Sequence, residues 1–394
     1  MQAPRAGNLS AKRTEVGLEP GRAQLECWRV DWLIVTDRDT GGVPVTIIDL
    51  ARGLAEAGDR VTLLAAPVDG LDLLPNALAA GVDHLTWAGQ TSPSGMHQLL
   101  QTMRSGRWSA VLSLHRGCDI AVAAACLLTG RRHVIALHGD PYYEATGTRF
   151  TGIRNRLWRQ AVARSCVLVS ISEYLAGRAR SFFQALPPRV AVIPNGNARQ
   201  SPAARAVPFP SGTVRLVACG RAYDAKQPHL LRPLVALLIG TGLAVEAVWI
   251  GDGPLAELQA DAEAHDLGSQ VRFIGHRQDP RRDLESGHVF VHFCLIEGFG
   301  LAVIEAMAAG LPVVAFAAGA LPELVTTGVE GTLVPPNDLP ALAHAIRRLV
   351  HDPQTHQQAA EAALRRASTF TRAAMAAGYR RALAIENALE TPPA

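Results

Sequence analysis

The sequence Glu297-Gly-Phe-Gly-Leu-Ala-Val-Ile-Glu305 is the most informative part of the chain, because two carboxylates lie eight positions apart across the predicted start of a helix. Gly298 and Gly300 allow a tight turn and a close approach of a ligand to the backbone. The free amides at the start of the helix attract phosphate. A phosphate site flanked by two carboxylates that accept hydrogen bonds from hydroxyl groups predicts a ligand with both phosphate and sugar, which is a nucleotide sugar.

Length and composition predict a globular protein of two domains. The chain has 394 residues, 48% of them hydrophobic and 19% charged, which is enough for two separate cores. A net charge of +3 gives no indication of a nucleic-acid partner, and we expect none. The longest apolar stretches, residues 233–250 and 301–318, are interrupted well before the roughly 20 residues that a membrane span needs.

The N-terminal segment and the cysteines indicate a cytoplasmic protein. Residues 1–27 are mixed and polar, without the apolar core of a signal peptide, and we expect a disordered tail. The six cysteines lie far apart and show no metal-binding spacing. Reduced thiols in a cytoplasmic protein, without a metal site, are therefore expected.

Apolar runs of strand length alternate with helical patterns along the whole chain, which is typical of parallel sheets covered by helices. Proline-rich residues 196–212 lack periodicity and suggest a linker. The pattern predicts an α/β protein with doubly wound domains at 28–195 and 213–370. Predicted strands are 30–35, 61–65, 111–114, 133–137, 167–170 and 190–193, then 214–218, 244–250, 271–274, 289–293, 312–316 and 331–334, with helices at about 338–350, 354–368 and 371–388.

Several motifs in order resemble the retaining glycosyltransferases of family 4, which have the GT-B fold. Besides residues 297–305, they are Gly220-Arg221 with Lys226, Gly251-Asp-Gly-Pro254, Gly310-Leu-Pro312, Gly319-Ala-Leu-Pro-Glu323 and Gly328-Val-Glu-Gly331. The resemblance covers roughly residues 30–379. It implies two Rossmann-like domains that face a central cleft, with the acceptor bound by the first and the donor by the second. It also implies that residues 371–394 form a helix crossing back to the first domain.

Two cations follow the strand predicted at 214–218, where ligands bind in open α/β sheets. They are Arg221, after Gly220, and Lys226 on the same loop. Of the 38 basic residues, only Lys12 and Lys226 are lysine, which indicates that a compact ammonium is wanted at residue 226. By resemblance, Arg221 and Lys226 clamp the diphosphate and offset the charge on the leaving nucleotide. An ordinary surface lysine is the alternative.

The resemblance also assigns the residues of the first motif. Glu305 is expected to accept hydrogen bonds from the ribose, and Glu297 from the transferred sugar. The backbone of Gly298, Phe299, Gly300 and Leu301 is expected to complete the phosphate site. Two solvated glutamates are the alternative. At Gly319 the chain departs from the family's usual glycine pair, because Ala320 takes the second place.

Loops of the first domain carry three further candidates. Gly41 and Gly42 follow the first strand, and by resemblance they bring amides close to phosphate or sugar, although a plain turn is the alternative. His138 follows the strand predicted at 133–137 and by resemblance lies near the transferred sugar, although a structural histidine is the alternative. Ser172 lines the same expected cleft, but a helix N-cap explains it equally well.

The segment Asp37-Arg-Asp39 is similar to the Asp-x-Asp pair with which another glycosyltransferase fold holds a divalent ion. Here it stands in the first domain, whereas the predicted donor site lies in the second. Because Arg221 and Lys226 supply positive charge there, no metal and no cofactor are expected. The nucleotide-diphosphate sugar is then a donor substrate.

A basic segment from Arg149 to Arg164 holds five arginines and no acid. An apolar stripe at helical spacing runs through it, made of Phe150, Ile153, Leu157, Trp158 and Ala161. The stripe predicts either peripheral contact with the inner face of a membrane or a helix packed on the first domain with a solvated basic edge.

The predicted function is transfer of a sugar, with retained anomeric configuration, from a nucleotide-diphosphate sugar to a hydroxyl of a glycan or lipid-linked acceptor. Cell-surface glycan, polysaccharide or glycolipid synthesis would need such a step. The alternatives are a nucleotide-sugar 2-epimerase and a non-catalytic partner subunit that binds a nucleotide sugar.

Overall fold

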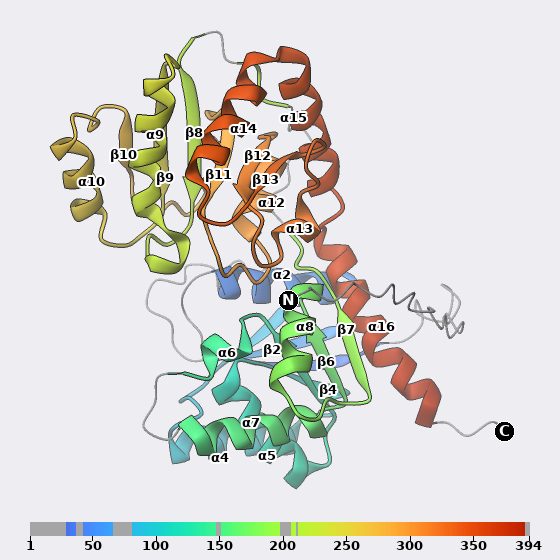
Figure 1. Ribbon diagram of the computed structural model, residues 1–394. Coiled ribbons are helices and arrows are strands. Elements are labelled where there is room, and N and C mark those ends of the chain that lie inside the picture. The colour runs from blue at the N-terminus through green and yellow to red at the C-terminus, as the bar shows by residue number, and fades with distance from the viewer. Residues whose placement is uncertain are drawn as a thin grey trace, which may run out of the picture.

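The computed structural model describes residues 29–36, 42–65, 81–146, 151–197, 206–209 and 212–390. These residues form two parallel sheets in two lobes, one built from the first half of the chain and one from the second (Figure 1). The α/β prediction with two doubly wound domains is therefore confirmed. The tail predicted at residues 1–27 lies outside the described residues.

The first sheet has the order β3-β2-β1-β4-β5-β6-β7. Its strands are β1 (Asp31–Thr36), β2 (Arg60–Ala65), β3 (Val82–Thr86), β4 (Ala110–Leu114), β5 (His133–Leu137), β6 (Val167–Ser170) and β7 (Arg189–Val192). The helices between them are α2 (Gly42–Glu56), α4 (Pro93–Ser105), α5 (Arg116–Thr129), α6 (Pro141–Glu144), α7 (Thr151–Arg164) and α8 (Glu173–Phe182).

The second sheet has the order β10-β9-β8-β11-β12-β13. Its strands are β8 (Val214–Cys219), β9 (Val245–Ile250), β10 (Val271–Phe273), β11 (Val289–His292), β12 (Val313–Phe316) and β13 (Gly331–Val334). Its helices are α9 (Leu231–Gly240), α10 (Leu255–Ala264), α11 (Arg281–Glu285), α12 (Leu301–Ala308), α13 (Leu321–Leu324), α14 (Leu339–His351) and α15 (Pro353–Ala367), with short 3-10 turns at Asp224–Lys226 and Pro228–Leu230.

Each strand predicted from an apolar run is present, but β3 was not predicted. β3 is an edge strand that pairs only with β2 among the described strands. Within its sequence Val-Asp-His-Leu-Thr, Val82 alone is buried. An edge strand with one buried residue leaves no apolar run, so a search for apolar runs misses it.

Both faces of the first sheet are covered, because successive side chains of a strand point to opposite faces. Trp32 and Ile34 of β1 lie in a core shared with α2 and α16 (Arg372–Glu390). Leu33 and Val35 lie in a core shared with α4 and α5. A chain segment more than 300 residues away thus completes the first domain.

The packing of α16 explains how that segment is held. Tyr379 is 2% exposed and lies in the same hydrophobic cluster as β1 and α2. Arg372 at the start of α16 bonds Glu56 at 2.6 Å and Asp49 at 3.2 Å, both on α2. Figure 1 shows α16 running from the second lobe along the first.

A buried polar network fixes α5 and α7 to the first sheet. Ser113 Oγ donates to Asp119 Oδ1 at 2.6 Å and lies 2.8 Å from His133 Nε2. Trp158 donates its indole N–H to Asp119 Oδ2 at 2.8 Å. Burial lowers the pKa of His133 to about 3, so the imidazole is neutral at physiological pH.

Two expectations about composition have structural counterparts. In the described part of the chain no disulfide joins the cysteines, which are Cys118, Cys126, Cys166, Cys219 and Cys294. No helix there combines the length and the apolar character that crossing a bilayer requires.

The predicted linker is described at residues 196, 197, 206–209 and 212. Val207 is buried there, and its backbone N–H donates to Gly310 O at 3.2 Å.

Candidate active site

The central feature of the second domain is an ion pair between the two candidates Lys226 and Glu297. Lys226 Nζ lies 2.5 Å from Glu297 Oε2. His292, the last residue of β11, places its Nε2 2.9 Å from the same oxygen. Because an ionised carboxylate only accepts hydrogen bonds, His292 is the donor. The loop after β8 and the loop after β11 meet at this carboxylate, since β8 and β11 are neighbours in the sheet.

Charge is stabilised strongly within this cluster. Burial opposes ionisation of Glu297, but the ammonium of Lys226 and the hydrogen bond from His292 outweigh it and hold the pKa of Glu297 well below its usual range. Burial also opposes the charge on Lys226, but attraction to Glu297 outweighs it and raises the pKa of Lys226. Burial lowers the pKa of His292. The cluster therefore holds a cation, an anion and a neutral imidazole at neutral pH.

Both hydrogen bonds that described residues donate to the Glu297 carboxylate are made to Oε2. Oε1 has no such partner among them. The arrangement fixes the orientation of the carboxylate and leaves its second oxygen for a hydroxyl group, which suits the role expected of Glu297.

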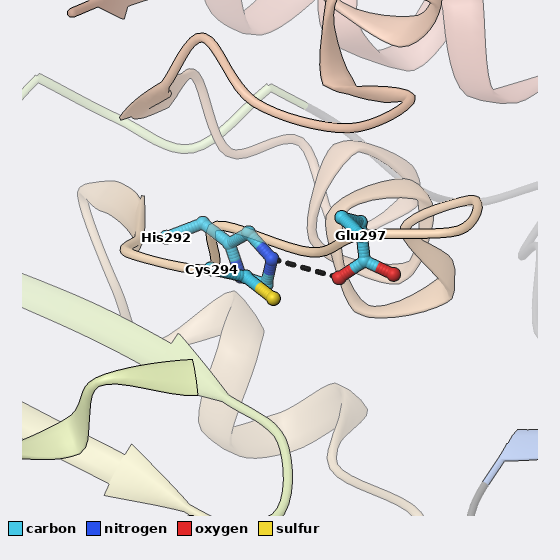
Figure 2. Close-up of side chains that lie close together, drawn as sticks. All are labelled: His292, Cys294 and Glu297. Carbon is cyan, nitrogen blue, oxygen red and sulfur yellow. Dashed lines mark hydrogen bonds and ion pairs between the residues drawn. The ribbon is translucent and has the colours of Figure 1, made fainter. Parts of the chain in front are cut away.

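His292, Cys294 and Glu297 also form a group that could hold a metal ion. Their ligand atoms lie within 4.8 Å of one another, and Figure 2 shows the imidazole directed at the carboxylate with the thiol beside it. Nitrogen, sulfur and oxygen ligands of this kind suit Zn²⁺. However, the Lys226 ammonium already contacts the carboxylate oxygen. Burial also raises the pKa of Cys294, so the thiol stays protonated.

Arg221 lies on the same loop as Lys226 but differs in exposure. Gly220 precedes it, and Trp249 donates its indole N–H to Gly220 O at 2.8 Å, which anchors the loop to β9. The Arg221 side chain is exposed, with its guanidinium 5.3 Å from the centre of the Tyr223 ring. The loop therefore carries one exposed cation that a ligand can reach, Arg221, and one largely covered cation held in place by Glu297, Lys226.

The start of α12 has the features that a phosphate site needs. Gly300 adopts φ 103°, which favours glycine, and no side chain caps the helix. Leu301 begins α12, and Glu305 lies one turn further on and is partly exposed. The side chain of Phe299 is 4% exposed and packs edge-on against Phe370 with ring centres 5.8 Å apart. Only the backbone of Phe299 is therefore available to a ligand.

Loops of the first domain meet the Glu297 loop directly. Ser172 Oγ donates to Gly298 O at 2.7 Å. A Cβ added at Gly298 would lie 3.2 Å from Leu175 Cδ1 and 3.4 Å from His138 O, so glycine permits this close approach. Candidates His138 and Ser172 are thus brought beside Gly298. The loops after β5, β6 and β11 that meet here are called the interdomain face below.

A second contact between the two domains uses Glu323 of α13. Glu323 Oε2 accepts from Glu173 N at 2.8 Å, and Oε1 accepts from Tyr174 N at 2.6 Å. Ser172 also caps α8, with its Oγ accepting from Leu175 N at 3.1 Å. The N-cap interpretation of Ser172 is therefore confirmed. The carboxylate of one domain satisfies the free amides of a helix in the other.

Gly41 lies outside the described residues, as do Asp37 and Asp39. Gly42 is the first residue of α2. Sequence reasoning missed His292, Cys294 and Glu323 as members of the site. Their only sequence signal was position, since His292 ends an apolar strand five residues before Glu297 and Glu323 ends the motif that begins at Gly319.

Comparison with known families accounts for both halves of the chain. Residues 40–197 match the family described as Glycosyltransferase Family 4. Residues 213–352 match the one described as Glycosyl transferases group 1. The chain belongs to glycosyltransferase family 4. It is a glycosyltransferase, and the resemblance in the motifs is confirmed.

Curated relatives are similar over most of their length. A D-inositol 3-phosphate glycosyltransferase of Corynebacterium diphtheriae is 28% identical over 385 residues, covering 86% of this chain and 88% of the relative. A phosphatidyl-myo-inositol mannosyltransferase of Mycolicibacterium smegmatis is 28% identical over 337 residues, covering 80% and 82%.

Solved structures share the fold. Anabaena Alr3699/HepE in complex with UDP and glucose has a TM-score of 0.75 at 21% identity, covering 90% of this chain and 100% of that one. A sucrose-phosphate synthase from Thermosynechococcus elongatus has a TM-score of 0.76 at 18% identity, covering 92% and 100%. These likenesses establish the GT-B fold for this chain.

Proposed function

We propose that this glycosyltransferase moves a sugar from a nucleotide-diphosphate sugar to a hydroxyl of a glycan or lipid-linked acceptor, with retention of the anomeric configuration. The second domain, proposed as residues 213–370, binds the donor. The first, proposed as 28–195, binds the acceptor. The names of the curated relatives, which include glycosyltransferases for inositol phosphate and for phosphatidyl-myo-inositol, support an acceptor of this class.

The ion pair of Lys226 and Glu297 beside the start of α12, at the interdomain face, is the main support for this function. A cation and free helix amides suit the diphosphate of a donor. A carboxylate fixed through one oxygen suits a sugar hydroxyl. First-domain loops with His138 and Ser172 adjoin the same place through Gly298.

Each candidate residue has a separate role in the proposed transfer. As the bond from the anomeric carbon to the diphosphate breaks, negative charge grows on the leaving phosphate, and Arg221 and Lys226 stabilise it. Lys226 has three N–H donors, so it can hold Glu297 and still reach a phosphate oxygen. Glu297 would orient the sugar through Oε1, and Glu305 would hold the ribose. Gly42 and His138 would contribute from the first domain.

The experiment is a screen of nucleotide sugars, beginning with UDP-glucose, for thermal stabilisation and then for transfer. A ligand at 100 times its dissociation constant adds about 2.7 kcal/mol of stability. Proton NMR of the product should show the same anomeric configuration as the donor. Conversion of the donor alone to its 2-epimer would instead support the epimerase, and binding without any turnover would support a non-catalytic subunit.

We also propose that the outer surface of α7 contacts a membrane. Trp158 and Ala161 of the predicted apolar stripe are buried against the first domain together with Val162, so this part of the stripe is structural. Ile153 is 65% exposed and Leu157 is 48% exposed, within the basic segment. Exposed apolar side chains among arginines suit an anionic lipid surface.

Flotation with vesicles tests this contact. The protein should float with anionic vesicles and not with neutral ones, and the double change Ile153→Ser with Leu157→Ser should abolish flotation. Leu237→Ser, at a residue 40% exposed on α9, is the matched control and should float as the wild type does. Equal flotation of all three proteins would contradict the proposal.

A further inference from the structure

His115 is held in a backbone conformation that histidine normally avoids. It stands between β4 and α5 with φ 77° and ψ 147°. This region is open essentially to glycine alone, because a Cβ collides with the neighbouring backbone there. His115 also makes no side-chain cap to the helix that it precedes. Nothing in the local structure of α5 therefore explains a histidine at this position.

The imidazole is buried without hydrogen bonds. His115 is 7% exposed, and in the described part of the chain neither of its ring nitrogens has a hydrogen-bond partner. Glu144 Oε1 lies 3.8 Å from Nδ1 of His115, which is beyond hydrogen-bond length. Burial of polar atoms without partners destabilises a fold. Strain and unpaired burial in one residue are together typical of a functional site.

The surroundings of His115 place it near the interdomain face. β4 and β5 are neighbours, so the loops after them lie side by side. Glu144 lies against the loop after β5, since a Cβ added at Gly139 would collide with Glu144 Oε1. The preceding residue, His138, has its carbonyl beside Gly298. The pair of His115 and Glu144 thus belongs to the first-domain loops that adjoin the Glu297 loop.

We propose that His115 and Glu144 bind the reacting hydroxyl of the acceptor. A neutral imidazole donates one hydrogen bond and accepts another, and a carboxylate accepts. A hydroxyl between them can donate to one and accept from the other, which supplies the partner that the imidazole lacks. The donor's charged groups face the cations of the second domain, which leaves the first-domain loops for the acceptor. This inference rests on the proposed transfer reaction.

The test is His115→Gly, because glycine is relaxed at this φ and ψ and removes the imidazole. We expect a melting temperature no lower than that of the wild type. We also expect kcat/KM for the acceptor to fall about 10-fold or more, the effect of losing one or two substrate hydrogen bonds. Thermal stabilisation by the nucleoside diphosphate should be unchanged. Glu144→Gln should lower acceptor kcat/KM in the same direction.

His133→Gln is the matched control, because His133 is also buried at the first sheet but is bonded to Ser113. It should lower the melting temperature and leave the acceptor KM unchanged. The role of His115 is contradicted if the wild type transfers sugar and His115→Gly has the same kcat/KM for the acceptor. It is also contradicted if His115→Gly loses thermal stabilisation by the nucleoside diphosphate. In both cases the proposed transfer reaction is unaffected. If the wild type turns over no nucleotide sugar, the proposed function fails and this inference with it.

Discussion

Replacing Lys226 by methionine tests the site most directly, because it removes the ammonium and keeps the length of the side chain. In the pair with Glu297 the two side chains are 17% and 12% exposed, and the charged atoms are 2.5 Å apart. Removing one partner of a buried pair costs about 3–5 kcal/mol, because the other charge stays buried. His292 still bonds Glu297, so we expect a value near the lower limit, about 3 kcal/mol.

The same change should slow transfer. Loss of one preorganised group that stabilises developing charge costs about 10²-fold or more in rate, equivalent to about 3 kcal/mol. Lys226→Arg is the control. It keeps the charge but not the compact ammonium, so it should retain more stability than Lys226→Met and recover only part of the rate.

The assay is urea unfolding of the wild type, Lys226→Met, Glu297→Gln and the double variant, with transfer rates measured on each. Because the double variant leaves no uncompensated charge, its loss of unfolding free energy should be smaller than the sum of the two single losses by about 1 kcal/mol or more. Additive losses would show that the ion pair is not coupled in solution. Full transfer by Lys226→Met would refute its role at the diphosphate.

Three further predictions follow from the site and the first domain. Glu305→Gln should weaken binding of the free nucleoside diphosphate, whereas Glu297→Gln should preserve it and depress transfer; isothermal titration separates these outcomes, and equal losses would contradict the assignment. Transfer should persist in excess EDTA, since Arg221 and Lys226 supply the positive charge, and activity restored only by Mg²⁺ or Mn²⁺ would count against this. The pKa of His133 is about 3 in the folded protein and about 6.5 in the unfolded chain. Between these pH values the unfolded chain binds more protons at His133 than the folded protein does. The unfolding free energy therefore falls as pH falls from 6.5 towards 3. His133→Gln should make the fall in unfolding free energy between pH 6.5 and 5 shallower by up to about 1.4 kcal/mol per pH unit. An unchanged slope would show that His133 is not the cause of this pH dependence.

The fold class and the family can be predicted from the amino-acid sequence. Buried parallel strands must be nearly continuous apolar runs, so β1 and β11 are visible without any structure. The motif at residues 297–305 and the lone lysine of the second domain, Lys226, are also local signals, because a glycine turn, a helix start and a residue type are each written in a few consecutive positions.

Which charged side chains contact one another could not be predicted from the sequence and is known from the three-dimensional structure. Lys226 and Glu297 are 71 residues apart, and Glu323 reaches the amide of Glu173 over 150 residues. Such contacts depend on strand order and on how two domains approach, and neither leaves a periodic trace in the chain. The strain at His115 is invisible for a related reason: φ at a single residue is imposed by the packing of β4 and α5 around it, against the preference of its own side chain.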